Sequence, residues 1–200
     1  MISFDFESAM KKLQNDLKAE RYIHSIGVME TAQKLAKRFG VDEQKAKIAG
    51  ILHDCAKNIV VSQSYAMCDM FSIKLDDVSK KSYKLVHQYL GAKLAETEFG
   101  ITDEEILSAI RFHTTARANM SQIEKVIYLA DFIEPNRDKE PFDGLSKLRL
   151  LCEKDIDEAM LFSLDISIES VVSRKLLLHI DTALARNWFL DKKMSKTLEK

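Results

Sequence analysis

Apolar residues recur at intervals of three and four along almost the whole of this 200-residue chain. This spacing places them on one face of an α-helix, and no run of two-residue alternation is long enough to require a sheet. Only six glycines and two prolines interrupt the chain, so long helices are favoured. No internal repeat or flexible linker divides it. The sequence therefore predicts an all-α helical bundle, a single domain over residues 1–200.

Signals for helix starts and ends predict where the helices lie. Ser3 or Asp5 caps an N-terminal helix within residues 1–20, and Gly40 ends a second helix over 21–39. The remaining expectations are helices over 42–57, 62–71, 86–99, 103–113, 121–134 and 155–191, a loop over 136–144, and a frayed tail over 192–200.

Composition excludes several classes of protein. Thirty basic and thirty-one acidic residues leave a formal net charge of -1, without the positive field that non-specific nucleic-acid binding requires. No stretch approaches the roughly twenty apolar residues of a membrane span, and the N-terminus lacks the apolar core of a signal peptide. Three cysteines without C-x-x-C spacing favour a reducing compartment. We expect a cytoplasmic protein with no nucleic-acid or membrane partner.

The adjacent residues His53 and Asp54 are the first sign of chemistry. They lie in AKIAGILHDCA, which is apolar nearly all round and predicts the buried central helix. An unpaired carboxylate there is costly to desolvate, and a bound cation removes that cost. A structural His–Asp hydrogen bond is the alternative. Cys55 follows the pair, but a small buried filler is the better interpretation than a nucleophile.

Two further polar residues stand on apolar helix faces. Asp131 interrupts VIYLADFIEP, where only a cation or strong donors would keep a carboxylate ionised. His24 shares a face with apolar residues at increments of three and four, which indicates either a ligand or a hydrogen-bonded core histidine. For Glu134 and Arg137, at the end of the same helix as Asp131, the simple expectation is a solvated salt bridge.

His87 and His113 complete the set of histidines on apolar faces. His113 is followed by Thr114 and, shortly after, Arg117, and an imidazole beside hydroxyl and guanidinium donors suits a phosphate. The alternatives are a satisfied histidine at a helix start for His87, and one favoured by the helix dipole for His113.

Imidazole and carboxylate ligands in this mixture suit Fe, Mn, Co, Zn or Ni better than Ca or Mg. The sequence therefore predicts a transition-metal site built from several helices. A histidine-lined core without metal is the alternative.

The order H…HD…H…H…D resembles the HD superfamily of metal-dependent phosphohydrolases. RYIHSIGVMETAQKLA, AGILHDCAK, HQYLGA, IRFHTTAR, YLADFIEPNRD and DTALARN closely resemble segments of its branch of YqeK-type symmetrical bis(5′-nucleosyl)-tetraphosphatases. The resemblance runs from Arg21 to Asn187, and it implies an HD-domain helical bundle.

The resemblance also implies site roles. Iron or a similar ion is held by His24, His53, Asp54 and Asp131. His87 and His113 hold a second ion where there are two metals, and face the phosphates where there is one. Substrate contacts are expected from Lys57, His24, His87, His113, Thr114, Arg117, Asp131 and Arg137, with Arg174 and the residues before His179 near the nucleotide.

The activity implied is hydrolysis of a dinucleoside tetraphosphate, such as diadenosine tetraphosphate, at its central linkage to give two ADP. Asp54 orients the attacking water, Lys57 offsets phosphate charge, and His113 donates a proton to the leaving phosphate. The alternatives are another HD phosphohydrolase, acting on a nucleoside monophosphate, a deoxynucleoside triphosphate or a cyclic dinucleotide, and a non-catalytic nucleotide-sensing module. A homodimer is a further expectation.

Overall fold

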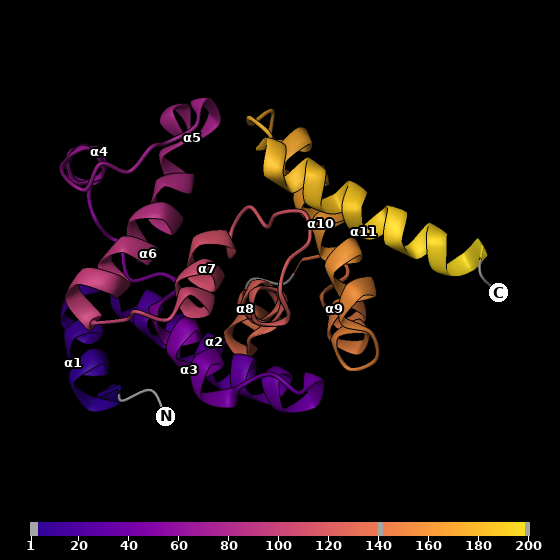
Figure 1. Ribbon diagram of the computed structural model, residues 1–200, viewed down its shortest axis with the longest axis horizontal. Coiled ribbons are helices and arrows are strands. Elements are labelled where there is room, and N and C mark those ends of the chain that lie inside the picture. The colour runs from indigo at the N-terminus through magenta and orange to yellow at the C-terminus, as the bar shows by residue number, and fades with distance from the viewer. Residues whose placement is uncertain (1–3, 140–141, 199–200) are drawn as a thin grey trace.

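The computed structural model describes residues 4–139 and 142–198 (Figure 1). Within these stretches the chain forms α-helices and two short 3-10 helices and no strand, so the all-α prediction is confirmed. The elements are α1 (Phe6–Asp16), α2 (Ala19–Phe39), α3 (Glu43–Leu52), α4 (Val61–Met70), α5 (Asp77–Lys81), η1 (Tyr83–Leu85), α6 (Val86–Phe99), α7 (Glu104–Phe112), α8 (Gln122–Ile133), η2 (Pro135–Lys139), α9 (Leu145–Cys152), α10 (Ile156–Ser173) and α11 (Ile180–Leu198).

The helix ends follow the local signals in the sequence. Asp5, Asp103 and Ser121 each accept hydrogen bonds from backbone N–H groups of the turn that follows, which satisfies donors that a helix start leaves unpaired. Gly40 ends α2 in the left-handed conformation, with φ 67°, as expected of a terminating glycine. The other proposed first cap, Ser3, lies outside the described residues.

The N-terminal prediction and the central helix both need correction. The first helix ends at Asp16 and α2 begins at Ala19, because the backbone of residues 17–18 is extended. The central helix α3 ends at Leu52 instead of residue 57, and residues 53–58 form turns. Successive side chains of a helix point about 100° apart. Because His53 and Asp54 lie in turns instead, both side chains can point to the same site.

The C-terminal half also differs from the prediction. The helix expected over 155–191 is two helices, α10 and α11, because the chain turns back after Ser173 through Lys175, which has φ 54°. Neither Gly nor Pro marks that turn in the sequence. The tail expected to fray is helical through Leu198, and residues 199–200 lie outside the described part. The helices α5 and α9 were not predicted.

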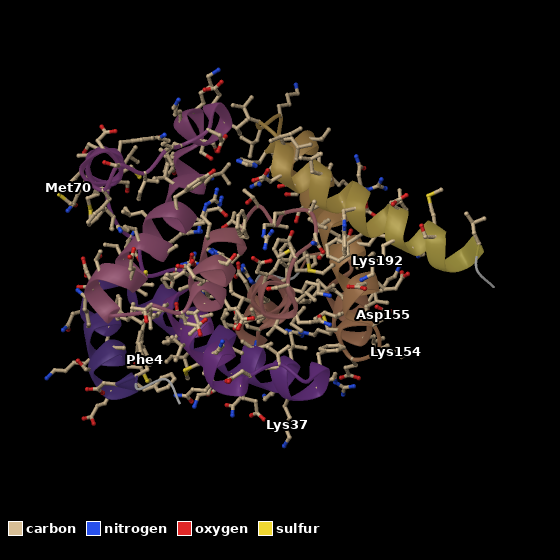
Figure 2. The ribbon with its side chains drawn as sticks, viewed as in Figure 1. Phe4, Lys37, Met70, Lys154, Asp155 and Lys192 are labelled. Atoms are coloured by element: carbon tan, nitrogen blue, oxygen red, sulfur yellow. The ribbon has the colours of Figure 1, made fainter. Side chains whose placement is uncertain are left out.

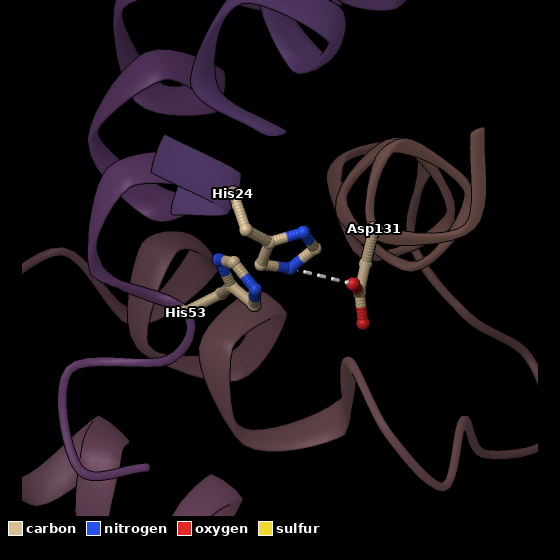
Figure 3. Close-up of side chains that lie close together, drawn as sticks. All are labelled: His24, His53 and Asp131. Carbon is tan, nitrogen blue, oxygen red and sulfur yellow. Dashed lines mark ion pairs between the residues drawn. The ribbon is translucent and has the colours of Figure 1, made fainter. Parts of the chain in front are cut away.

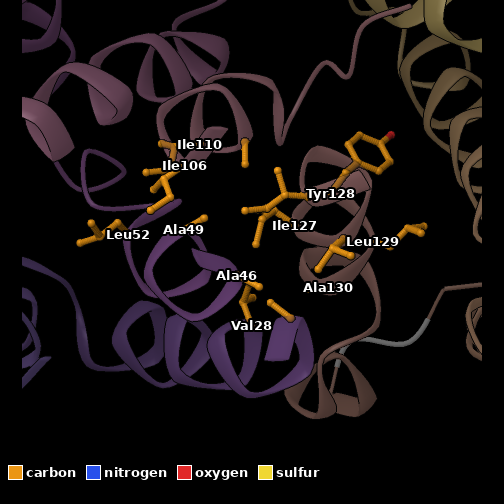
Figure 4. Packing of buried hydrophobic residues seen from close by; sticks show 14 of the residues in the cluster. Val28, Ala46, Ala49, Leu52, Ile106, Ile110, Ile127, Tyr128, Leu129 and Ala130 are labelled. Atoms are coloured by element: carbon orange, nitrogen blue, oxygen red, sulfur yellow. The ribbon is translucent and has the colours of Figure 1, made fainter. Parts of the chain in front are cut away.

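The core lies where α2, α3, α7 and α8 meet (Figure 4). Val28, Ala49, Ile110 and Ile127 come from these four helices and are fully buried. Gly50 allows α2 and α3 to pack closely, because a Cβ there would lie 2.9 Å from the Cα of Met29. This packing fixes the helix ends that carry the polar residues of the site.

Figure 2 shows the charged side chains of Lys37 and Lys154 pointing away from the bundle. Among the described residues, no helix combines the length and hydropathy needed to cross a membrane.

Candidate metal centre

The structure brings together the six residues that the sequence singled out on apolar faces. His24 comes from α2, His53 and Asp54 from the turns after α3, His87 from α6, His113 from the residue after α7, and Asp131 from α8. Five of them are at most 7% exposed, and the side chain of Asp131 is 19% exposed. Figure 3 shows His24, His53 and Asp131 converging from three segments.

Each of the four histidines turns Nδ1 away from the centre and Nε2 toward it. The Nδ1 partners are Glu134 Oε1 for His24 (3.0 Å), Gly50 O for His53 (2.8 Å), Lys84 O for His87 (2.7 Å) and Ile110 O for His113 (2.7 Å). A carbonyl oxygen only accepts hydrogen bonds, so Nδ1 donates in the last three. Their Nε2 atoms therefore offer lone pairs to the centre, as metal-binding imidazoles do.

Buried atoms at the centre lack hydrogen-bond partners. Within the described residues, none is found for Nε2 of His24, Nε2 of His53 or Oδ1 of Asp54. Ligand atoms of His24, His53 and Asp131 lie within 4.8 Å of one another, and those of His53, Asp54 and His113 do likewise. Unpaired acceptors inside a protein are costly, and a cation satisfies them. The donor set therefore fits a metal ion.

Asp54 lies between two pairs of histidines. Its Oδ2 is 3.5 Å from Nε2 of His53 and 4.0 Å from Nε2 of His24. Its Oδ1 is 3.2 Å from Nε2 of His87 and 3.5 Å from Nε2 of His113. One carboxylate thus faces two adjoining compartments.

Cationic side chains approach the two aspartates. Arg21 Nη1 is 2.8 Å from Asp54 Oδ2, and Lys57 Nζ is 3.4 Å from Asp54 Oδ1. Arg137 donates from Nη2 to Asp131 Oδ1 at 2.7 Å and from Nε to the Asp131 carbonyl at 2.9 Å. These groups offset the cost of burying the carboxylates.

The protonation states suit ligands. Burial raises the pKa of Asp54, but electrostatic interactions with its neighbours His53 and Lys57 outweigh it and hold that pKa well below its usual value. Burial also raises the pKa of Asp131, and the nearby imidazole of His24 has the largest effect in the opposite direction, so that this pKa also lies well below its usual value. Both carboxylates are therefore ionised at neutral pH.

Burial lowers the pKa of His53, and burial together with the charge of Lys57 lowers that of His87 to about 4. These two rings are therefore neutral at pH 7. Burial lowers the pKa of His24 as well, but the neighbouring carboxylates of Asp131 and Glu134 outweigh that effect and raise the pKa above its ordinary value.

The second compartment holds a lysine and a threonine. His87 Nε2 and His113 Nε2 are 3.0 Å apart, and Thr114 Oγ1 lies 3.2 Å and 3.0 Å from them. Lys57 Nζ is 3.0 Å from Nε2 of His87. Four of the residues predicted to contact substrate therefore lie against one another.

A cavity of about 550 Å³ opens beside His24, with Lys57 and Arg137 in its wall. The sequence analysis assigned no site role to its other lining residues, among them Lys18, Arg21 and Asn58. Arg21 could have been found, since it precedes His24 by three residues on the same helical face. No local pattern singles out Lys18 or Asn58.

Of the residues predicted to contact substrate, His24, Lys57 and Arg137 line this cavity and six others do not. His87, His113, Thr114 and Asp131 lie at the metal centre, whereas Arg117 and Arg174 make their contacts elsewhere. Arg117 donates from Nε to Glu124 Oε1 at 3.0 Å. Arg174 is exposed at the end of α10, where its Nε donates to the Ser170 carbonyl. Their roles toward substrate stay predictions. His179 is buried and bonds to Asp76 at 2.9 Å.

The expected salt bridge between Glu134 and Arg137 is wrong. Glu134 is 1% exposed and hydrogen-bonds to His24, while Arg137 pairs with Asp131. The interpretation of Cys55 as a buried filler is supported: the residue is 8% exposed, and its Sγ lies 3.5 Å from the Gly91 carbonyl oxygen.

Comparisons with known proteins place this arrangement in a family. The HD domain model matches residues 21–136. The chain is 40% identical over 187 residues, 92% of this chain and 97% of the relative, to the symmetrical bis(5′-nucleosyl)-tetraphosphatase of Bacillus subtilis. The symmetrical bis(5′-nucleosyl)-tetraphosphatase of Halalkalibacterium halodurans is 41% identical to this chain over 184 residues, 91% of this chain and 95% of the relative.

A solved structure shares the fold. The crystal structure of a predicted HD superfamily hydrolase involved in NAD metabolism, from Clostridium acetobutylicum, matches with a TM-score of 0.90 and 39% sequence identity. The match covers 96% of this chain and 100% of the other. The converging histidines and aspartates and these relatives lead to one conclusion: the chain belongs to the HD domain family, in the branch of the symmetrical bis(5′-nucleosyl)-tetraphosphatases.

Proposed function

We propose that this chain hydrolyses dinucleoside tetraphosphates, diadenosine tetraphosphate among them, at the central phosphoanhydride to give two molecules of ADP. The names of its relatives support the substrate class. The observation that carries the proposal is the cavity, which opens on His24. Four cationic residues, Lys18, Arg21, Lys57 and Arg137, outnumber two glutamates, Glu20 and Glu134, in its lining. Cationic donors beside a set of unpaired ligand atoms suit a polyphosphate chain.

The ion that we propose is iron, with Mn, Co, Ni or Zn as chemically similar alternatives. His24, His53, Asp54 and Asp131 would hold it. When bound, such an ion lowers the pKa of water from about 16 to about 7 and so supplies a nucleophile at neutral pH. Asp54, which reaches both compartments, orients the attacking water toward phosphorus.

We propose that the arginines exchange partners when substrate binds. Without substrate, Arg21 and Arg137 pair with the carboxylates of Asp54 and Asp131. Phosphate oxygens offer the same guanidinium groups an equivalent charge-assisted partner. The two side chains would then hold the phosphate chain in the cavity and offset the charge that develops as the anhydride bond breaks.

For the second compartment we propose a phosphate site instead of a second ion. The Lys57 ammonium lies 3.0 Å from Nε2 of His87, in the space that a second cation bound by His87 would need. A bridging phosphate oxygen there can accept hydrogen bonds from Lys57 and Thr114. His113, 3.0 Å from Thr114 Oγ1, would take up a proton on Nε2 and then donate it to the leaving phosphate.

The test is chromatography of the products from diadenosine tetraphosphate, with the protein loaded in turn with Fe²⁺, Mn²⁺ and Zn²⁺. ADP as sole product supports the proposal, and AMP with ATP overturns symmetrical cleavage. Including a nucleoside monophosphate, a deoxynucleoside triphosphate and a cyclic dinucleotide tests the other HD phosphohydrolase reactions. Binding without turnover, unchanged by Asp54→Asn, would indicate a nucleotide-sensing module.

Two broader proposals accompany the activity. The three cysteines are unpaired and buried, as in proteins of a reducing compartment, and we propose a cytoplasmic location without a nucleic-acid partner. A homodimer remains a prediction. Light scattering coupled to gel filtration measures the mass against 22.9 kDa for one chain.

A further inference from the structure

Both ring nitrogens of His24 face carboxylates from the end of one helix. Nε2 lies 3.0 Å from Asp131 Oδ1, and Nδ1 lies 3.0 Å from Glu134 Oε1. Asp131 is in the last turn of α8 and Glu134 immediately follows the helix. Residues three apart share a helical face, so the same helix end reaches the ring on both sides. Only Asp131 belongs to the ligand set described above.

Glu134 is held more firmly than a surface carboxylate would be. Its side chain is 1% exposed. Oε1 faces His24, while Oε2 accepts hydrogen bonds from the backbone N of Asn136 at 2.7 Å and from its Nδ2 at 3.0 Å. With Oε2 already occupied by two donors, the carboxylate presents one fixed acceptor to the imidazole. That acceptor fixes both the ring orientation and the nitrogen that carries the proton.

The opposite helix leaves room for this carboxylate. Gly27 lies one turn after His24 in α2, and a Cβ at Gly27 would collide with Oε2 of Glu134 and lie 3.1 Å from Nδ2 of Asn136. Glycine inside a helix is less favourable than alanine. The close approach of Glu134 to His24 therefore depends on a residue that weakens α2 locally.

We propose that Glu134 is the positioning residue of the metal centre: it accepts the Nδ1 proton of His24, so that Nε2 presents its lone pair to the ion. The inference rests on the metal site of the proposed function. A carboxylate behind a histidine ligand orients the ring and makes it a stronger donor, and its loss costs about 10–100-fold in metal affinity. Glu134 acts through His24 in this role, although it also lies in the wall of the cavity beside that histidine.

The experiment measures Mn²⁺ affinity by calorimetry and, in Zn²⁺-loaded protein labelled with ¹⁵N-histidine, the Nδ1–H signal of His24. The variant is Glu134→Gln. An amide has one acceptor and one donor end, so it cannot accept from both His24 and Asn136. We expect Mn²⁺ affinity to fall about 10–100-fold and the slowly exchanging Nδ1–H signal to disappear.

Gly27→Ala provides a second variant that keeps the carboxylate but displaces it. It should weaken Mn²⁺ binding in the same direction as Glu134→Gln. The matched control is Glu124→Gln, which removes a glutamate in the first turn of α8 that is also 1% exposed but accepts from Ser121 and Arg117. Its Mn²⁺ affinity and the His24 signal should equal those of the original protein.

Equal Mn²⁺ affinity of Glu134→Gln and the original protein, or an unchanged His24 signal in that variant, overturns the inference. A drop of the same size in Glu124→Gln also overturns it, because the effect would then be general loss of packing. If the original protein binds Mn²⁺ but does not cleave the dinucleotide, the proposed reaction fails while the affinity comparison still tests Glu134.

Discussion

Lys57 Nζ lies 3.0 Å from Nε2 of His87 and 3.4 Å from Oδ1 of Asp54. The ring of His87 donates from Nδ1 to the Lys84 carbonyl, so its Nε2 accepts from the ammonium. A positive charge from the chain itself therefore stands beside a histidine that could otherwise hold a second ion. Removing Lys57 is therefore the most informative test of whether the compartment beside His87 and His113 binds phosphate or a second ion.

For Lys57→Ala we predict that kcat falls about 10²-fold, because one preorganised cation at the phosphate is lost. Affinity for the first ion should be unchanged. The matched control is Lys84→Ala, since Lys84 is exposed and meets His87 only through its carbonyl. Elemental analysis of the original protein should find one ion per chain, and two would contradict the phosphate-site proposal.

Arg21→Ala should raise KM for diadenosine tetraphosphate by about tenfold or more, the effect expected when a charge-assisted hydrogen bond to phosphate is lost. Steady-state kinetics measure it. Arg38→Ala is the control on the same helix, since Arg38 lies in the last turn of α2 and bonds to the Glu153 carbonyl. An unchanged KM in Arg21→Ala would remove Arg21 from the substrate site.

Cys55→Ala should keep full hydrolytic activity and lose about 1 kcal/mol of unfolding free energy, the usual scale for a small buried substitution. Burial raises the pKa of the Cys55 thiol, so the native thiol should not react with a disulfide reagent at pH 8. The reagent should titrate all three cysteines only in denaturant. Loss of activity in Cys55→Ala would reopen a catalytic role.

Asp76 should make stability depend on pH. Its Oδ2 accepts from Ser79 Oγ at 2.6 Å and Tyr89 OH at 2.5 Å, and lies 2.9 Å from Nε2 of His179. Burial raises the pKa of Asp76, but the hydrogen bonds from Ser79 and Tyr89 outweigh it and lower the pKa below its ordinary value. A depressed carboxyl pKa stabilises the fold above the unfolded value of about 4, and the stability is lost as pH falls below it.

We therefore predict that Asp76→Asn destabilises the protein at pH 7 by about 1–3 kcal/mol, the cost of disrupting a partly buried hydrogen-bond network. The difference from the original protein should shrink as pH falls from 4 to 2. Urea denaturation at several pH values measures it. The neighbouring Asp77, whose side chain is 91% exposed, gives the control Asp77→Asn, which should match the original protein throughout.

The sequence by itself determined the helical architecture, and it singled out the polar residues on apolar faces that the structure brings together. Helix starts at Asp103 and Ser121 were predictable because a cap involves only residues within one turn. Asp131 and His53 were predictable because a polar group on an apolar face needs a partner. The capping residues and the polar residues on apolar faces are both local signals, so they can be identified in a single sequence.

The tertiary structure alone decided which atoms meet. Glu134 contacts His24 across 110 positions of the chain, and Arg21 contacts Asp54 across 33, and no pattern of three or four residues encodes such distances. The turn at Lys175 could not be predicted from the sequence, because the helical spacing of apolar residues continues on both sides of it. Glu134 was expected to form an ion pair at the surface, but it is buried and bonds to His24 instead. Packing decides which charged groups lose contact with water, and a short sequence pattern does not show this.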